Sequence, residues 1–260
     1  MNENGLKKLD IILLGTLPIA AAIVSLIFKT NLLVSTMLFF GLPSAWLSYR
    51  TKSAIKKTAI FAAIFSILMT PMLDYVAVVN GVWVVSTVFP VKLFGTTPAE
   101  QFIWGFFFVY FLVIFYEHFF DKSKNEKINP RLKNFVIVFT ILSLSFLFVV
   151  FINPNIIQIE YAYFWIAFIF GFIELILFLL VYPGLLSKFF KTTIYFFSLA
   201  VLVEFTGLKL NHWFFPKNTK FIGWVGLFGL KFPFEEFLFY FVMLAAMILT
   251  YYEFFVDDRK

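Results

Sequence analysis

The sequence predicts an all-α integral membrane protein with about eight transmembrane helices. Hydrophobic residues make up 62% of the chain and charged residues only 14%, and the mean hydropathy is +0.92. A chain of this composition cannot be arranged around a soluble core. Its apolar runs are about twenty residues long, which is the length that crosses the hydrocarbon core of a bilayer. These runs fall at 9–28, 32–49, 54–73, 99–120, 132–152, 161–182, 190–209 and 234–255.

Two of the eight runs carry features that bear on their geometry. Pro43 interrupts the run at 32–49, and the run at 54–73 begins directly after the basic residues Arg50, Lys52, Lys56 and Lys57. We expect either of these two spans to be tilted or shortened. The remaining runs are continuous enough to cross the membrane as ordinary helices.

The distribution of Lys and Arg predicts the orientation in the cell membrane. Fifteen of these residues lie at the termini and in the connections on one side, against six on the other side. The positive-inside rule therefore predicts that both termini are cytoplasmic. This asymmetry explains the net charge of +6, so the charge gives no reason to expect nucleic-acid binding.

The chain contains an internal repeat. We divide it into a first membrane repeat at 1–121, a charged cytoplasmic linker at 122–133 and a second membrane repeat at 134–260. Each repeat has four spans, an even number, so we expect two parallel four-helix repeats of the same orientation. Matching landmarks lie 130 to 136 residues apart: Asp74 and Glu204, Trp83 and Trp213, Phe94-Gly95 and Phe228-Gly229, the two Pro-x-Glu motifs, and Tyr116-Glu117 and Tyr252-Glu253.

The connections at about 74–98 and 210–233 are long and apolar, being rich in Trp, Phe, Val and Gly. Such loops tend to fold back into the membrane, where protein rather than lipid surrounds their backbone. We expect both to pack on the non-cytoplasmic side and to close a dry, aromatic, acid-lined cavity between the halves.

Five acidic residues are candidate catalytic groups: Asp74, Glu100, Glu204, Glu235 and Glu236. A carboxylate at membrane depth is costly, so repeated acids there suggest a functional site. Desolvation and neighbouring carboxylates favour the protonated form, so we expect at least one acid to be a proton donor at neutral pH. Because Glu235 and Glu236 diverge by about 100° on a helix, only one of them can face a given point.

The first copy of the Pro-x-Glu motif carries Gln101 where the second carries Glu236. The two halves are therefore not expected to be chemically equivalent. The chain has no Cys, and its two His lie in different halves. Thiolate chemistry and a multi-histidine metal site are accordingly not expected.

The doubled motif, Pro98-Ala99-Glu100-Gln101 and Pro233-Phe234-Glu235-Glu236, with an acid and a Trp before each copy, resembles the integral-membrane lycopene cyclase family. The chain looks like the fused form, with two lycopene cyclase domain repeats, and the resemblance covers about 32–120 and 161–256. It departs from the family pattern at Gln101 and in the extra apolar span that begins each half. The resemblance implies carotenoid biosynthesis by a non-redox isomerase, a lycopene β-cyclase, that converts the linear ends of lycopene to β-rings.

The resemblance also implies roles for residues. Glu235 or Glu236 would donate the proton, with Glu100 as counterpart and Asp74 and Glu204 as partners or proton acceptors. The expected substrate-binding residues are Trp83, Trp104, Trp213, Gln101 and Phe237, the indoles stabilising a carbocation. No cofactor is expected, since no Gly-x-Gly-x-x-Gly motif follows a strand.

Two further residues and two other functions stay open. Glu174 lies in the middle of a span, where it either joins the acids or pairs with Gln101. His212 is either a proton relay or an ordinary loop histidine. A carotenoid hydratase requires the same protonation step, and a small proton-coupled transporter also explains repeated intramembrane acids.

Overall fold

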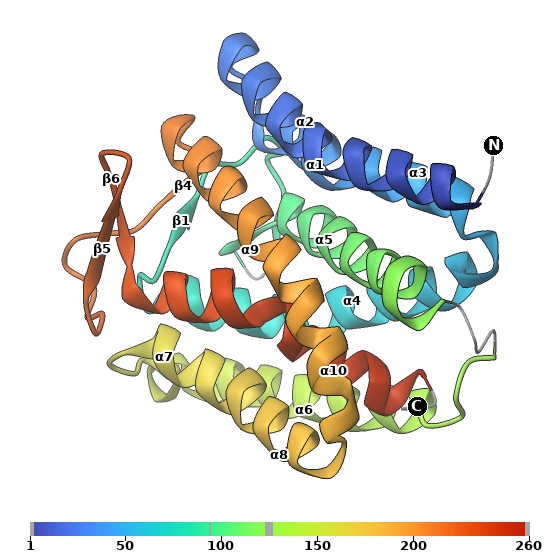
Figure 1. Cartoon of the computed structure of the whole chain (residues 1–260). Coiled ribbons are helices and arrows are strands. Elements are labelled where there is room, and N and C mark those ends of the chain that lie inside the picture. Colours follow the sequence, from blue (N-terminus) through green and yellow to red (C-terminus); the bar gives the residue numbers. More distant parts are fainter. Residues whose placement is uncertain (1–2, 94, 123–126, 258–260) are drawn as a thin grey trace.

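The computed structural model describes residues 3–93, 95–122 and 127–257. Within these ranges eight helical stretches are long and apolar enough to cross a membrane, which confirms the predicted all-α membrane fold (Figure 1). They are Lys7–Phe28, Leu32–Arg50, Lys52–Val79, Glu100–Asp121, Leu132–Ile152, Ala162–Val181, Pro183–Lys209 and Glu236–Phe255.

The first half contains the following elements in chain order. They are α1 (Glu3–Phe28), α2 (Leu32–Thr36), the π-helical turn η1 (Met37–Gly41), α3 (Leu42–Arg50), the 3₁₀ turn η2 (Lys52–Ala54), α4 (Ile55–Val79), β1 (Val84–Val85), β2 (Lys92–Leu93), β3 (Thr97–Pro98), α5 (Glu100–Tyr116) and the π-helical turn η3 (Glu117–Asp121).

The second half has a similar order, with the additional turn η4 and with its last π-helical segment before the final helix instead of after it. Its elements are α6 (Leu132–Ile152), the 3₁₀ turn η4 (Pro154–Ile157), α7 (Ala162–Ala167), the π-helical η5 (Phe168–Phe172), α8 (Ile173–Val181), the 3₁₀ turn η6 (Pro183–Leu185), α9 (Leu186–Lys209), β4 (Trp213–Phe214), β5 (Trp224–Leu227), β6 (Leu230–Pro233), the π-helical η7 (Glu236–Met243) and α10 (Leu244–Phe255).

The second span of each half contains a π-helical turn at the matching place, η1 and η5. In the first half Pro43 follows this turn. Proline lacks the N–H that an α-helix would offer to the carbonyl four residues earlier, and a π-helical turn relieves that mismatch. No proline follows η5. The turn is therefore a property of the repeat that accommodates Pro43, and the second span is not shortened at this residue.

The third span of each half is longer than its hydropathy suggests. Helix α4 continues from the predicted limit at residue 73 to Val79, and α9 with its 3₁₀ entry η6 starts at Pro183 rather than at 190. The extension of α4 brings Asp74 within a helix, as Glu204 is within α9, and both residues are buried. A drop in hydropathy marks a change of side chains, whereas the backbone hydrogen bonds of a helix continue through it.

The connections after α4 and α9 form short antiparallel strands. Strand β1 pairs with β4, and Val84 faces Phe214, which is the residue 130 positions later. A residue that pairs with its own repeat counterpart marks a two-fold relation between the halves. The remaining parts of the two connections form the hairpins β2–β3 and β5–β6.

These hairpins differ from the expected loops that fold back into the membrane. The β5–β6 hairpin extends beyond the helix ends (Figure 1), and no helical re-entrant segment occurs in the described parts of either connection. Gly95 and Gly229 reverse the chain with φ of 72° and 76°, values that glycine adopts readily. The landmark Phe94 lies outside the described residues.

Helices α5 and α10 are the most enclosed, whereas α1 and α6 to α8 present much of their surface outward. Near their carboxyl ends α5 and α10 exchange two hydrogen bonds, from the Tyr116 hydroxyl to Glu253 Oε1 and from the Tyr252 hydroxyl to Glu117 Oε1. The two bonds are counterparts under the repeat. They tie the halves together at the end of the bundle opposite the hairpins.

A buried ionic group joins the same helix ends. Lys57 Nζ lies 2.6 Å from Glu117 Oε1 and 3.3 Å from Asp257 Oδ2. Carboxylate oxygens of Glu117, Asp121 and Asp257 lie within 4.8 Å of one another. Because the Lys57 ammonium contacts two of these three acids, a cation is already present in the group.

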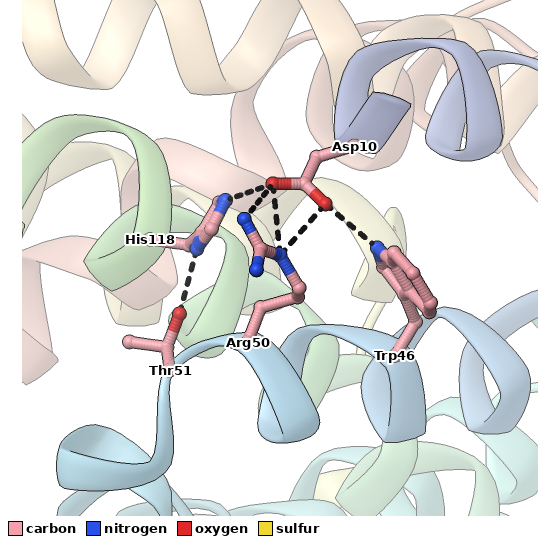
Figure 2. Close-up of polar contacts among 5 residues, drawn as sticks. All are labelled: Asp10, Trp46, Arg50, Thr51 and His118. Carbon is pink, nitrogen blue, oxygen red and sulfur yellow. Dashed lines mark hydrogen bonds and ion pairs between the residues drawn. The ribbon is translucent and has the colours of Figure 1, made fainter. Parts of the chain in front are cut away.

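A separate polar network anchors α1. Figure 2 shows the Asp10 carboxylate accepting from Trp46 Nε1 at 3.0 Å and from Arg50 Nε at 3.1 Å. His118 Nε2 lies 3.0 Å from the other Asp10 oxygen, and its Nδ1 lies 2.6 Å from the Thr51 hydroxyl. Asp10 is fully buried, and this set of contacts satisfies its charge. The network fixes the additional first span to α3 and η3.

Candidate active site

A cavity of about 270 Å³ lies between the two halves. Its walls come from α4 and α5 of the first half and from α7, η5, α9, η7 and α10 of the second half, with both Trp-bearing connections. Most of the lining is apolar and aromatic. The polar and indole-bearing residues among the lining are Asp74, Thr70, Trp83, Gln101, Trp104, Tyr163, Glu204, Trp213, Glu236, Tyr240 and Tyr251.

In the first half, Asp74 is the centre of a small hydrogen-bonded group. Trp83 Nε1 donates to Asp74 Oδ1 at 2.9 Å, and Gln101 Nε2 donates to the same oxygen at 3.1 Å. Asp74 Oδ2 is buried and has no hydrogen-bond partner among the described residues. Asp74, which lines the cavity, therefore has one hydrogen-bonded oxygen and one oxygen without a hydrogen bond among the described residues.

In the second half, Glu204 takes the place of Asp74. Trp213 Nε1 lies 3.2 Å from Glu204 Oε1 and 3.1 Å from Oε2. Glu236 lies close enough to act electrostatically on Glu204, and the Tyr163 hydroxyl donates to Glu236 Oε2 at 2.5 Å. Two carboxyl groups thus lie side by side here, where the first half has a carboxyl and an amide.

Aromatic rings form much of the remaining wall. Trp104 stacks on Phe108 with ring centres 5.2 Å apart, and Tyr240 packs on Trp104 at 6.2 Å. The Trp83 ring meets Tyr163 edge to face at 5.5 Å. Ring faces carry negative electrostatic potential, so such a wall favours a positive charge that develops inside the cavity.

The structure places two of the sequence-predicted catalytic acids outside the cavity. Glu100 Oε1 accepts hydrogen bonds from the backbone amides of Val88 and Phe89. Glu235 Oε1 accepts from the backbone amide of Ile222 at 2.7 Å. In each copy of the motif the first Glu thus secures the preceding connection. Of the two alternatives for the proton donor, Glu235 and Glu236, only Glu236 lines the cavity, because a helical step of about 100° turns its neighbour away. Glu100, the expected counterpart, is not among the lining residues either.

The other predicted site residues divide in the same way. Asp74, Glu204, Glu236, Gln101 and the three tryptophans Trp83, Trp104 and Trp213 all line the cavity. Phe237 does not, because it packs with Phe197 and Phe241 on the outer side of η7.

The two residues left open by the sequence lie elsewhere. Glu174 is half-buried on α8 and outside the cavity lining, and the Gln101 amide donates to Asp74 instead. His212 Nε2 donates to the backbone carbonyl of Thr30 at 2.8 Å. Its burial lowers the pKa of this imidazole below the ordinary value of 6.5. The neutral form that results serves as a structural hydrogen-bond donor.

Sequence reasoning missed Tyr163 and Tyr240. Both line the cavity, and the Tyr240 hydroxyl is buried without a partner among the described residues. Nothing in the sequence distinguishes these two from the other nine tyrosines. Only the packing of α7 and η7 against the first half shows their position.

Comparisons with known proteins identify no relative: no family model, no curated protein and no solved structure matches this chain.

Proposed function

We propose that this chain is a cofactor-independent carotene cyclase of the lycopene β-cyclase type. The observation that carries the proposal is the apolar cavity in which the carboxyl pair Glu204 and Glu236 lies close to indole rings. An apolar lining accepts a hydrocarbon end, a carboxyl pair supplies a proton, and indole faces stabilise the cation that protonation creates. These are the three requirements of a proton-initiated ring closure.

The carboxyl pair is suited to proton donation because its two members share one cavity wall. Glu204 is 1% exposed and Glu236 is 6% exposed. Two adjacent carboxyl groups in a low-dielectric site do not both ionise, since the second negative charge meets the first with little screening. The pair therefore retains a proton. Tyr163 holds Glu236 Oε2, so Oε1 is the oxygen that can carry the reacting proton.

The cation formed by protonation requires stabilisation and protection from water. Each indole face contributes about 0.5–2 kcal/mol to a nearby cation, depending on desolvation. The apolar lining limits the water that can capture the cation before the ring closes. The cavity volume of about 270 Å³ lies at the lower end of ligand pockets. It suits one end of a long polyene, with the remainder of the chain lying in the bilayer.

We also propose a location in the cell membrane with both termini on the cytoplasmic side. Contacts of Asp10 with Arg50 and of Lys57 with Asp257 bring both ends of the chain to the side opposite the hairpins. The excess of Lys and Arg on that side supports a cell-membrane protein with cytoplasmic termini. The hairpins then lie on the outer side.

Pigment chromatography from lycopene-accumulating cells tests the proposal. Cells expressing the chain are expected to convert lycopene to carotenes with β-rings. Glu236→Gln removes the proton and is expected to lower conversion about 100-fold or more, the scale of general acid catalysis. Glu235→Gln is the matched control, because the Gln oxygen still accepts from the Ile222 amide outside the cavity. Unchanged lycopene from a folded, membrane-inserted wild-type chain refutes the proposal.

A carotenoid hydratase is the second candidate, and one observation favours it. Asp74 and Tyr240 both line the cavity, and Asp74 Oδ2 and the Tyr240 hydroxyl have no hydrogen-bond partner among the described residues. A polar atom of this kind is a binding position for water, and water bound there would capture the cation. Products heavier by one water and still acyclic would identify the hydratase in the same experiment.

A further inference from the structure

The two halves present corresponding groups in a two-fold arrangement: the acid side chains differ in length, and the functional group differs at one position. Asp74, Trp83 and Gln101 in the first half correspond to Glu204, Trp213 and Glu236 in the second. In both halves the indole N–H donates to the carboxylate nine residues earlier. The pairing of Val84 with Phe214 places the two-fold relation beside these indoles. The amide of Gln101 in place of a carboxyl is thus a difference between otherwise equivalent groups.

We propose that this one difference decides which acids donate a proton to the substrate and which acid removes one. The Glu204–Glu236 pair donates a proton, Asp74 removes a proton from the ring formed, and Gln101 determines the role of Asp74. The inference rests on the proposed cyclase function and assigns roles within its site. It predicts that exchanging the side chains at positions 101 and 236 also exchanges the proton-donating and proton-accepting roles of the two halves.

The contacts of Asp74 suit a proton acceptor. Two N–H donors, from Trp83 and Gln101, bond to Oδ1. Burial works against the charged form of Asp74, and these donors offset part of that cost, so they stabilise the carboxylate that accepts the proton. The Gln101 amide has no acidic proton to transfer, and it adds no second negative charge. Oδ2 has no hydrogen-bond partner among the described residues, and Asp74 is one of the residues that line the cavity.

The step balances as an isomerisation. A proton of the Glu204–Glu236 pair adds to the terminal double bond and forms a C–H bond, leaving a tertiary cation. The electrons of the next double bond form the ring C–C bond and move the cation into the ring. Asp74 Oδ2 then removes a proton from the neighbouring ring carbon, and the electrons of that C–H bond form the ring double bond. The proton gained by Asp74 returns to the carboxyl pair before the next turnover.

Four chains expressed in lycopene-accumulating cells test the inference: wild type, Gln101→Glu, Glu236→Gln and the double variant. Gln101→Glu alone is expected to lower conversion about 10-fold or more, because it turns the acceptor into a second carboxyl pair. Glu236→Gln alone is expected to lower it at least about 100-fold. In the double variant Asp74 and the carboxyl introduced at position 101 form the donor pair, and Glu204 is the acceptor. Conversion is therefore expected to recover to within about 10-fold of wild type.

Whether Gln101→Glu raises or lowers conversion in each background distinguishes an exchange of catalytic roles from damage to the fold. The substitution is expected to harm the wild type and to help the Glu236→Gln chain, and simple destabilisation cannot reverse its sign between backgrounds. A folded double variant that is no more active than Glu236→Gln overturns the inference. If wild type itself leaves lycopene unchanged, the proposed function fails instead, which is a separate result.

Asp74 gives a second measurement that does not depend on the double variant. Asp74→Asn keeps the acceptor atoms for Trp83 and Gln101 but cannot take a proton, and it is expected to lower ring formation about 100-fold or more. Asp74→Glu is expected to retain much of it. Full cyclisation by Asp74→Asn overturns the inference even if the double variant does not fold.

Discussion

Gly207 allows the Trp213 indole to lie flat against α9. A Cβ built at this position overlaps the indole ring, with Cζ3 at 2.8 Å and two further ring carbons closer still. The ring cannot yield locally, because its N–H is bonded to Glu204. Gly207→Ala must therefore displace Trp213 from the cavity wall or break its bond to Glu204.

The magnitude of this effect follows from three contributions. Alanine stabilises a helix by about 0.5–1 kcal/mol relative to glycine. Forcing a methyl group into a packed site costs about 1–3 kcal/mol. Losing a hydrogen bond to a charged or shared carboxyl adds about 1.5–3 kcal/mol. The net expectation for Gly207→Ala is a destabilisation of about 2–5 kcal/mol, with loss of any activity that depends on Trp213.

Gly171→Ala is the matched control. Gly171 also lines the cavity, and the three atoms nearest to a Cβ there all belong to the Met247 side chain: Sδ overlaps it, and Cγ and Cε lie at 3.1 Å. Methionine is flexible and adjusts to such a contact. Thermal unfolding in detergent, followed by tryptophan fluorescence, compares the two variants. If Gly207→Ala is as stable as Gly171→Ala and its tryptophan spectrum is unchanged, the assigned role of Trp213 packing is wrong.

Two further predictions concern stability outside the cavity. Lys57→Met leaves the buried Glu117 carboxylate without its cation, and it is expected to lower the free energy of unfolding by about 3–5 kcal/mol. Lys56→Met changes the exposed neighbouring residue and is expected to alter stability by less than about 0.5 kcal/mol. Equal unfolding midpoints for the two variants would contradict this. Burial lowers the pKa of His212 below 6.5, although the hydrogen bond to the Thr30 carbonyl partly offsets the effect. The unfolded chain therefore binds a proton at His212 more readily than the folded chain does, and the folded state loses stability as the pH drops below about 6.5. The unfolding midpoint of His212→Gln is expected to change less than that of wild type between pH 7.5 and pH 5.5, and identical pH slopes would refute it.

The number of membrane helices could be predicted from the sequence, because a span is recognised by the length and the hydropathy of an apolar run. A bilayer fixes both the length and the hydropathy of a span. The ends of α4 and α9 could not be predicted as well, since hydrogen bonds carry each helix past the point where Asp74 or Lys188 lowers the hydropathy. The loops were the weakest part, because hairpin formation depends on pairing between distant segments.

The cavity lining was partly accessible to sequence reasoning through the repeat. Asp74 and Glu204 stand out because acids are rare within spans. Each is followed nine residues later by a tryptophan, Trp83 or Trp213, and this recurrence strengthens the prediction. The choice between two adjacent glutamates was not accessible, because it depends on the rotation of the helix about its axis. Tyr163 was missed for a different reason, since its contact with Glu236 joins residues 73 positions apart on separate helices.

The pairing of Val84 with Phe214 has a consequence for how such a chain arises. Two identical four-helix subunits joined at this strand would form an isologous dimer, in which each contact occurs twice and only residues on the axis meet their own copies. In such a dimer any substitution at position 101 would appear twice, and the site would hold either two amides or two acids. Duplication and fusion into one gene remove that constraint. In a single polypeptide the two matching positions are separate residues, so a glutamine can lie beside the first acid and a glutamate beside the second.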